Sequence, residues 1–361
     1  MGNLFAYHWK SVFCHDRIDE DAQEARERLM KVSVKPSGSA FSQNCLALEP
    51  KFDLQIIVPA YNVEAYLEQC IFSIILQKTK YNIQIQIVDD GSTDRTGQIA
   101  DAFTDPRIRV IHQKNQGAAA ARNTALKYLN ARYIMFVDAD DWIPAGCIDA
   151  LLDVALEKDA QIVQGGYQHQ DGDYISPGLE YPQLERVTDP AQLYGFPVGK
   201  VYKRELWQHI SFPEGFWYED TVLSFLLFPQ ITEAWLIPET VYVYRKNING
   251  ATFTGRHNVK CLDTYWITEE LMAERVKLKL PADERYQQRF FRQILLNSQR
   301  IDNLPEQNKR DVFLLTCDLY NRFFSNAKVC VRYRQLQKAV CLRDFGLFGL
   351  CLRYRAVLFH K

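Results

Sequence analysis

The sequence predicts an α/β protein with a mainly parallel sheet flanked by helices, followed by a helical C-terminal region. Between residues 54 and 137, four short apolar runs alternate with stretches whose apolar residues recur at helical spacing. Strands that alternate with helices typically pair in parallel, with helices on both faces of the sheet. After about Thr254 the strand signals fade and long helical patterns follow. We therefore expect an N-terminal extension over residues 1–50, an α/β domain over 51–255 and a helical region over 256–361.

The individual elements follow from the apolar spacing and from the residues that interrupt it. Strands are expected at 54–58, 83–88, 107–111 and 133–137. Helices are expected at 67–75, from an N-cap at Ser92 or Thr93 through Phe103, at 117–129, at 265–279 and at 286–301. In a sheet of this kind ligands bind beyond the carboxyl ends of the strands, so functional residues are expected there.

Composition and charge limit the classes of partner and compartment. The 361 residues, 47% of them hydrophobic, suffice for one large core and a smaller unit. The net charge of -1 provides no general attraction to nucleic acid, so we expect no nucleic-acid partner. The nine cysteines form no C-x-x-C pair, which argues against a disulfide framework or structural zinc. Without a signal peptide or an apolar run of about 20 residues, the chain is expected to be cytoplasmic.

The pair Asp138 and Asp140 follows directly after the apolar run 133–137. Successive side chains of a strand point to opposite faces, so carboxylates at i and i+2 project the same way. Such a pair can hold Mg²⁺ or Mn²⁺ and leave coordination positions open for phosphate oxygens. The same spacing recurs in a charged, helical stretch and in a polar turn, where we expect no metal: Asp19-Glu20-Asp21 and Asp171-Gly172-Asp173.

Polar residues also follow the first three predicted strands. They are Pro59-Ala60-Tyr61-Asn62, then Asp89-Asp90-Gly91-Ser92-Thr93-Asp94, then Asn115-Gln116-Gly117 with Arg122-Asn123. A tyrosine can stack on a base, and carboxylates can accept hydrogen bonds from a base or a ribose. Each cluster alone also fits turn chemistry, a core tyrosine or a solvated arginine. Their convergence on one edge of the sheet favours a nucleotide site.

Four segments at these strand ends resemble the family 2 glycosyltransferases with the GT-A fold. They are IIVPAYN, IVDDGSTDRT, NQGAAAARN and MFVDADDW, and they cover about residues 53–143 densely. The later GKVYKREL (199–206) and FPEGFWYED (212–220) resemble the acceptor half of that family, whereas the first 50 and last 100 residues are not covered. The resemblance is strongest to bacterial enzymes that build capsule, exopolysaccharide or lipopolysaccharide. It implies a hexosyltransferase-type reaction, in which a sugar moves with inversion from a nucleoside diphosphate, expected to be UDP, to an acceptor hydroxyl.

The resemblance also implies roles for particular residues. Donor-binding residues would be Pro59, Tyr61, Asn62, Glu64, Asp89, Asp90, Gly91, Arg122 and Asp138. Asp138 and Asp140 would hold the divalent metal, Mn²⁺ or Mg²⁺. The general base would be Asp220, with Glu219 beside it as a positioning residue. An acid at the start of a helix, stabilised by the helix dipole, is the alternative interpretation of Asp220.

The acceptor side is less specified by the sequence. Trp217 and Tyr218 could form a platform on which a sugar stacks, or they could be buried aromatics. Lys200 could approach the diphosphate or the acceptor, although a surface lysine is the more frequent outcome. The resemblance implies a saccharide or a lipid-linked saccharide as the acceptor.

The last segment, 336–361, combines apolar residues with Arg343, Arg353, Arg355 and Lys361. A segment of this kind can lie at a membrane interface, with its basic groups toward anionic lipid. It can equally be a helix packed on the core. In the first case the protein would be peripheral on the inner face of the plasma membrane.

Two other functions compete with glycosyl transfer. A sugar nucleotidyltransferase also uses an α/β sheet and a divalent metal, but it requires a Gly-rich basic loop after the first strand, where this chain has Pro-Ala-Tyr-Asn. A non-catalytic sugar-nucleotide-binding protein would not need a base. The presence of both Asp138/Asp140 and Glu219-Asp220 argues against this second alternative.

Overall fold

The computed structural model describes residues 15–247 and 258–354. These residues form two compact units. One comprises residues 37–247, and the other comprises residues 15–36 together with 258–354. The predicted boundary at 255/256 and the end of the predicted membrane segment, 355–361, lie outside the described residues.

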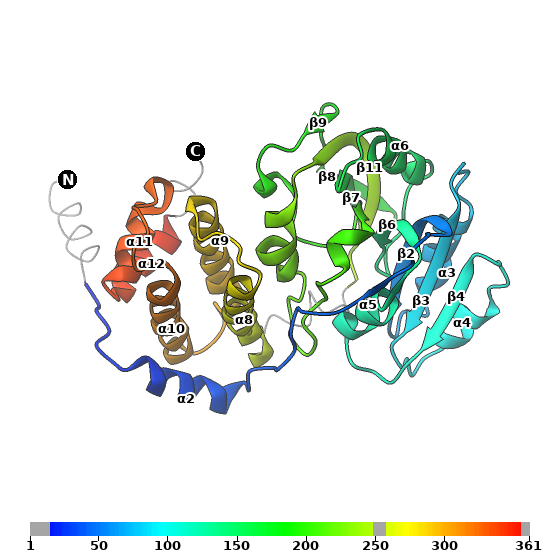
Figure 1. Cartoon of the computed structure of the whole chain (residues 1–361). Helices are drawn as coiled ribbons and strands as arrows, with labels where there is room; N and C mark the ends of the chain where they lie inside the picture. Colours follow the sequence, from blue (N-terminus) through cyan, green and yellow to red (C-terminus); the bar gives the residue numbers. More distant parts are fainter. Residues whose placement is uncertain (1–14, 248–257, 355–361) are drawn as a thin grey trace, which may run out of the picture. The chain divides into compact units, whose positions relative to one another are not determined.

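The first unit is built on a mixed sheet (Figure 1), which has nine strands among the described residues. The strands of this unit are β1 (Cys45–Leu46), β2 (Phe52–Ala60), β3 (Ile83–Asp89), β4 (Ile108–His112), β5 (Tyr128–Leu129), β6 (Ala131–Phe136), β7 (Ile162–Asp171), β8 (Tyr174–Leu179), β9 (Glu185–Arg186), β10 (Lys200–Lys203) and β11 (Ala234–Arg245). The order is β4-β3-β2-β6-β10-β7-β11-β9, with β8 on β7, while β1 and β5 pair separately. The four strands predicted from the sequence are the parallel set β4-β3-β2-β6.

The direction of the strands decides which ends meet. Strand β10 is antiparallel to both β6 and β7, and β11 is parallel to β7. The strands β2, β3, β4, β6, β7 and β11 therefore all run the same way. Their carboxyl ends share one edge of the sheet, and this edge carries the polar clusters that the sequence analysis singled out.

The helices of this unit are α3 (Leu67–Ile75), α4 (Thr96–Ala102), α5 (Ala118–Leu126) and α6 (Cys147–Glu157), with the short turns η1 (Pro190–Gln192), η2 (Arg204–Trp207), η3 (Leu223–Leu227) and η4 (Phe228–Gln230). The chain crosses from β4 back past β2 to β6 through α5. Because such crossovers are right-handed, α5 covers the opposite face from α3 and α4. The predicted N-cap of α4 is wrong, because the helix begins at Thr96 and Ser92 instead accepts a hydrogen bond from the Asn62 amide.

A cluster of buried aromatic rings lies where β6 meets the chain leading to residue 220. The Phe136 ring contacts those of Tyr202, Trp207 and Phe212 with centroids 5.9, 5.2 and 5.4 Å apart. All four side chains are fully buried. Edge-to-face packing of this kind holds Phe212, and hence the start of segment 212–220, against β6, the strand that ends just before Asp138.

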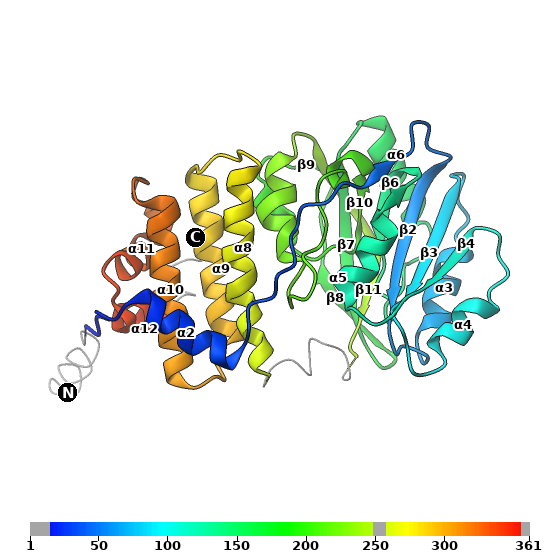
Figure 2. The same cartoon turned by 60° about the horizontal axis from the view of Figure 1, so that its bottom comes forward.

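The second unit is helical, as predicted for the C-terminal region. It contains α2 (Ala22–Val32), η6 (Val259–Leu262), α8 (Asp263–Lys277), α9 (Glu284–Arg300), α10 (Glu306–Phe324), η7 (Val331–Tyr333), α11 (Arg334–Cys341) and α12 (Phe345–Arg353). Helices α8, α9 and α10 lie alongside one another, and α2 packs on α10 (Figures 1 and 2). The described residues before Pro36 therefore fold with helices that come more than 200 residues later.

The apolar residues of α12 pack inside the helical unit. Phe348 and Cys351 are buried, and the Phe313 ring of α10 lies 4.6 Å from that of Phe348 and 5.5 Å from that of Phe345. For this part of the predicted membrane segment, the structure shows a helix packed on the core. Among the described residues, no helix is both long and apolar enough to cross a bilayer.

Candidate active site

The carboxylate pair lies just beyond β6. Asp138 and Asp140 are partly exposed, whereas Ala139 between them is 97% buried. This is the alternation that the sequence predicted. Burial, together with the charge of Asp138, raises the pKa of Asp140. Burial and the nearby carboxylate both disfavour the charged form of Asp140, and a bound cation would favour it.

Arg122 on α5 links this pair to a segment almost 100 residues later. Its guanidinium donates to Asp138 Oδ1 at 2.8 Å and to Glu219 Oε1 at 2.6 Å, and it lies over the Phe212 ring. Burial opposes the charged form, but the two carboxylates raise the pKa of Arg122, so the guanidinium stays charged. Its Nε is buried without a hydrogen-bond partner among the described residues. The solvated arginine considered as an alternative is therefore wrong.

The segment that carries Glu219 and Asp220 is held from α5 as well. The Asn123 side chain donates to Phe212 O at 2.8 Å and accepts from Phe212 N at 2.9 Å. Tyr218 has a φ of 65°, an unusual conformation for a bulky residue that typically marks strain or function. A helical segment then begins, since Leu223 N donates to Asp220 O at 3.0 Å and continues into the π-helical turn η3. Asp220 thus occupies the helix start that its alternative interpretation described, beside Glu219 and its partner Arg122.

The loops after β2 and β3 form the other side of the site. Tyr61 is 46% exposed, so it is not a core residue, and its ring is accessible for stacking. The Asn62 side chain accepts from Thr93 N at 2.8 Å, and its backbone has a φ of 51°. Glu64 accepts from Arg95 N at 2.9 Å. These bonds fasten the two loops to each other and leave Tyr61 at their surface.

Asp89 and Asp90 are buried and already bonded within the protein. Asp90 is 2% exposed and accepts from Gln113 Nε2 at 2.7 Å, Gln116 N at 3.0 Å and Gly117 N at 2.7 Å. Asp89 accepts from Ser92 N and contacts His112; although burial opposes it, these hydrogen bonds lower the pKa of Asp89. Both side chains shape the loops, and a ligand would reach only the remaining lone pair of Asp90.

Gly91 has a structural requirement of its own. Its φ is 71°, and a Cβ at this position would lie 2.7 Å from Asn115 N. The space beside this glycine is therefore filled by the chain itself, where the loops after β3 and β4 meet. Pro59 lies within β2 opposite Val88.

The residues expected on the acceptor side differ in position. Trp217 and Tyr218 are partly exposed, with ring centroids 6.4 Å apart and nearly perpendicular planes. Lys200 is fully buried, which contradicts the surface lysine considered as an alternative. Its ammonium donates to Tyr194 O at 3.1 Å and Phe196 O at 2.7 Å. Burial lowers the pKa of Lys200, and the nearby charge of Asp220 opposes that shift. In this structure Lys200 braces the loop 194–196 and offers no exposed contact for an acceptor.

The carboxylate pair fits a divalent cation that takes its remaining ligands from elsewhere. No group of three or more His, Cys, Asp or Glu side chains that could hold a metal occurs in the part of the chain that the structure describes. Two carboxylates on one side of a strand end, one of them with a raised pKa, fit a cation that shares its coordination with a diphosphate. Of the other two D-x-D sequences, 171–173 lies in the turn between β7 and β8 as predicted, whereas 19–21 lies before α2 and not within a helix, with Asp21 as its N-cap.

The sequence analysis missed residues that surround the carboxylate pair. Asp141 is 1% exposed, and burial together with the charges of Asp140 and Asp138 raises its pKa. It is bonded to Tyr242 and Arg245, and Asn247 donates to Asp140 Oδ2 at 3.0 Å. The third acid of the D-A-D-D run was visible in the sequence, but its partners lie about 100 residues away and no local pattern connects them.

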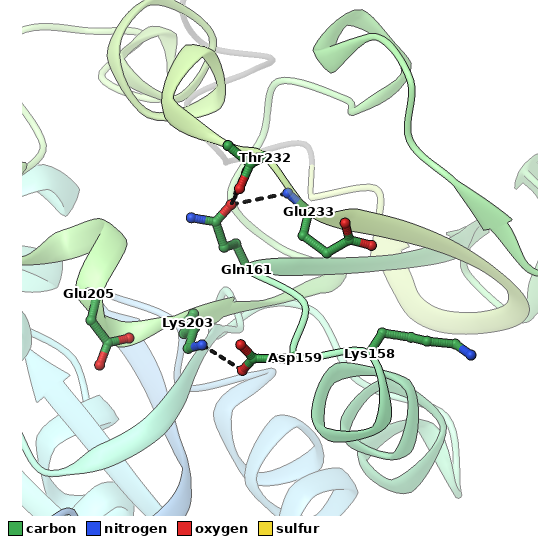
Figure 3. Close-up of a pocket in the computed structure, with 7 residues that line it drawn as sticks. All are labelled: Lys158, Asp159, Gln161, Lys203, Glu205, Thr232 and Glu233. Carbon is green, nitrogen blue, oxygen red and sulfur yellow. Dashed lines mark hydrogen bonds and ion pairs between the residues drawn. The ribbon is translucent and has the colours of Figure 1, made fainter.

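A pocket lies at the other end of these strands, beside the residues that precede β7 and β11 (Figure 3). It has a volume of about 410 Å³ and is lined by Lys158, Asp159, Gln161, Lys203, Glu205, Thr232 and Glu233. Lys203 donates to Asp159 at 2.6 Å, and Gln161 accepts from Thr232 N at 2.7 Å. Residues before β7 and β11 form its walls, so it lies at the opposite end of the strands from Asp138 and Asp140. Much of its polar lining is hydrogen-bonded within the protein.

Comparisons with known proteins agree with this geometry. Residues 55–209 match the family model described as Glycosyl transferase family 2. The chain is similar to an uncharacterised glycosyltransferase, EpsJ of Bacillus subtilis (35% identity over 55% of this chain), and to the glycosyltransferase GlyG of Streptococcus pneumoniae (32% over 54%). The matched region spans 62% of EpsJ, 30% of GlyA from S. pneumoniae and 70% of GlyG.

Solved structures of S. aureus TarS share the fold. The TarS complex with UDP-GlcNAc superposes with a TM-score of 0.67 at 17% identity, covering 86% of this chain and 93% of that one. The complex with UDP gives a TM-score of 0.69. These matches confirm the predicted GT-A type α/β fold with a helical C-terminal region. The family model and the relatives show that the chain belongs to glycosyltransferase family 2.

Proposed function

We propose that this glycosyltransferase moves a sugar from a UDP-sugar, with inversion, to a hydroxyl of a saccharide or lipid-linked saccharide in bacterial surface polysaccharide synthesis. The observation that carries the proposal is Arg122, which contacts both Asp138 and Glu219. The proposed metal pair and the proposed base motif lie about 80 residues apart in the sequence, yet one buried side chain joins them. A site for donor and acceptor needs both.

The choice of donor and pathway rests on relatives. TarS was crystallised with UDP-GlcNAc and with UDP. A further relative is WfgD of Escherichia coli, 33% identical over 44% of this chain, which is named a UDP-Glc:alpha-D-GlcNAc-diphosphoundecaprenol beta-1,3-glucosyltransferase. These names support a uridine nucleotide and an acceptor on a lipid diphosphate for this chain as well.

In the proposed reaction, the exposed Tyr61 stacks on the base, and the loops fastened by Asn62 and Glu64 enclose the nucleoside. Asp220 takes the proton of the acceptor hydroxyl while that oxygen bonds to the anomeric carbon. The bond from the anomeric carbon to the diphosphate breaks on the opposite face, so the configuration inverts. Arg122 holds Glu219 close to Asp138, and it thereby fixes the position of the neighbouring Asp220.

Asp138 and Asp140 would hold the divalent metal, Mn²⁺ or Mg²⁺. When bound, the metal would neutralise negative charge on the leaving diphosphate. Arg122 lies beside Asp138 and would add positive charge there. Trp217 and Tyr218 remain the proposed contacts for the acceptor sugar, because both are partly exposed next to the base motif.

A panel of UDP-, GDP- and dTDP-sugars with Mn²⁺, scored for release of the nucleoside diphosphate, tests the donor class. We expect release from UDP-sugars alone, and none after chelation of the metal. Preference for another nucleotide would overturn the donor assignment. Binding of UDP without turnover of any UDP-sugar, with or without saccharide acceptors, would argue against the reaction itself.

We also propose that the enzyme is cytoplasmic and contacts the inner face of the plasma membrane through basic residues of the helical unit. Residues 319–343 contain six basic and no acidic residues. Arg334 and Lys338 lie one turn apart on the exposed side of α11, and Val331 just before them is 83% exposed. Basic groups beside exposed apolar side chains suit an anionic lipid surface.

Co-sedimentation of the full chain with vesicles tests this contact. We expect binding to phosphatidylglycerol vesicles, and weaker binding when Arg334→Gln and Lys338→Gln are combined. A control with Lys78→Gln and Lys127→Gln removes the same charge from exposed positions of the other unit. Equal binding by both double variants would contradict the assignment of this face.

A further inference from the structure

We propose that the end of β11 acts as a clamp that holds segment 138–142, with Tyr242 and Asp141 as positioning residues for the carboxylate pair. The inference rests on the proposed function in that the pair is taken to bind metal and diphosphate. It goes beyond that proposal by assigning roles to residues that touch neither donor nor acceptor.

The first contact of the clamp involves the amide of Asp138. The ladder between β2 and β6 ends where Val137 N donates to Ile57 O at 3.0 Å. The next amide, Asp138 N, instead donates to the hydroxyl of Tyr242 at 3.1 Å. Tyr242 belongs to β11, three strands away from β6 in the sheet order. The fully buried Tyr242 side chain therefore provides a hydrogen bond to the first backbone amide beyond the β2–β6 ladder.

Asp141 completes this contact. The Tyr242 hydroxyl donates to Asp141 Oδ2 at 2.6 Å, and Arg245 N donates to Asp141 Oδ1 at 2.7 Å. The hydroxyl thus donates to one residue of the segment and accepts from another, so its orientation is fixed at both ends. Asp141 is 1% exposed, and burying a carboxylate this completely is costly unless hydrogen bonds replace its hydration, as these two do in part.

Two further contacts reach Asp140 itself. Arg245 Nε donates to Asp140 O at 2.9 Å, while its NH2 group donates to Gln69 of α3 at 2.7 Å. Asn247 Nδ2 donates to Asp140 Oδ2 at 3.0 Å. A bridge between Trp142 and Val243 closes the segment, with Val243 N donating to Trp142 O at 2.9 Å. Contacts from β11 and the residues after it therefore reach Asp138, Asp140, Asp141 and Trp142.

The consequence is preorganisation. Two carboxylates on a loop would repel each other and turn apart, and bringing them together at the moment of binding would weaken binding. The clamp fixes the backbone at both residues in the ligand-free chain. Outer partners of this kind commonly change metal or ligand affinity about 10- to 100-fold when they are removed.

The test uses the full chain with Tyr242→Phe, Asp141→Asn and the control Tyr133→Phe. The control removes another buried hydroxyl from the same sheet. The Tyr133 hydroxyl lies 2.9 Å from Ala155 O and 3.0 Å from Ala160 O. Hydrogen exchange is measured by mass spectrometry without ligand. We expect peptides that cover 138–142 to exchange about 10-fold faster in the two clamp variants and at the wild-type rate in Tyr133→Phe.

The second measurement is the affinity for UDP with Mn²⁺ by calorimetry. We expect a loss of about 10-fold in the clamp variants and less than about 2-fold in the control. Wild-type exchange at 138–142 in Tyr242→Phe would overturn the clamp, as would faster exchange throughout the sheet in both clamp variants. Failure of the wild-type chain to bind UDP would instead overturn the proposed function, and the exchange data would still decide whether the clamp exists.

Discussion

A buried charge cluster in the sheet unit and one in the helical unit have opposite compositions. In the sheet unit one cation, Arg122, lies between two carboxylates, Asp138 and Glu219. In the helical unit one carboxylate, Glu269, accepts from Arg26, Lys35 and Arg322. Both central groups are at least 95% buried.

The clusters differ in what lies around them. Arg26 and Arg322 connect Glu269 on α8 to α2 and α10, and although burial opposes it, Arg26 and Lys35 lower the pKa of Glu269 to about 2. Around Arg122, the Asp138 side chain is 31% exposed and the neighbouring Asp140 has a raised pKa. In the helical cluster three cations surround one carboxylate, and the cluster stabilises the fold. In the sheet cluster two carboxylates share one cation, so the cluster is short of positive charge and fits a cationic ligand. We infer that the sign of the net charge, and not burial alone, distinguishes a ligand site from a cluster that only stabilises the fold.

The largest expected effect is that of Asp220→Asn on turnover. Removing a general base typically costs about 10²- to 10⁴-fold in rate, because the acceptor hydroxyl keeps its proton in the transition state. UDP affinity should change little, since the base lies on the acceptor side. Steady-state release of UDP and calorimetric UDP binding check both points. Asp189→Asn, a surface cap of η1, serves as the control, and wild-type turnover in Asp220→Asn would refute the base assignment.

Arg122→Met tests whether the sheet cluster acts as one unit. Removing one partner of a buried ion pair typically costs about 3–5 kcal/mol, because two carboxylates lose their common cation. Turnover of the UDP-sugar should fall as well, because Asp138 and Glu219 are no longer held together. Arg107→Met breaks a more exposed pair with Asp105 and should cost at most about 1 kcal/mol. Chemical denaturation measures both, and equal costs would mean that Arg122 does not join the two motifs.

Asp140→Asn sharpens the claim that the sheet cluster lacks positive charge. With half of the proposed metal pair removed, UDP affinity in Mn²⁺ should drop about 10- to 100-fold and become insensitive to added metal. The matched control is Asp173→Asn, which alters a D-x-D sequence in the turn between β7 and β8. A metal response retained in Asp140→Asn, or lost in Asp173→Asn, would place the metal elsewhere.

The helical cluster should respond to acid. The folded pKa of Glu269 is lowered from 4.5 to about 2, so its contribution is present above about pH 4.5 and is lost as the pH falls toward 2. A shift of this size corresponds to about 3 kcal/mol. The free energy of unfolding of wild type minus that of Glu269→Gln should therefore shrink between pH 5 and pH 2. In the control Glu270→Gln, which removes the carboxylate paired with Lys35 alone, the difference should stay small. A difference that does not depend on pH would contradict the lowered pKa.

Local periodicity predicted the parts of this molecule that depend on neighbouring residues. It predicted the parallel strands β2, β3, β4 and β6, the common direction of Asp138 and Asp140, and the helices of the C-terminal region, because each follows from spacing within one element. It mispredicted the N-cap of α4, since Ser92 is used by the adjacent loop instead. The antiparallel strand β10 also lay outside the alternating pattern.

Long-range partners were beyond sequence reasoning. Arg122 was selected as a donor residue, but nothing local connects it to Glu219, 97 positions later. Lys200 was expected to face either the ligand or solvent, and the carbonyl groups of Tyr194 and Phe196 that bury it could not be foreseen. The hydrogen bonds that saturate Asp90 come from the loop after another strand. In each case the partner is fixed by tertiary packing, which a single sequence does not specify.

The most direct test is a crystal structure of the Asp220→Asn protein soaked with a UDP-sugar and Mn²⁺, recorded with anomalous scattering. Our account predicts one manganese peak between the diphosphate and the carboxylates of Asp138 and Asp140. It also predicts that residue 220 faces the anomeric carbon from the side opposite the diphosphate. A nucleotide bound without metal at this pair, or residue 220 on the same side as the leaving group, would contradict it.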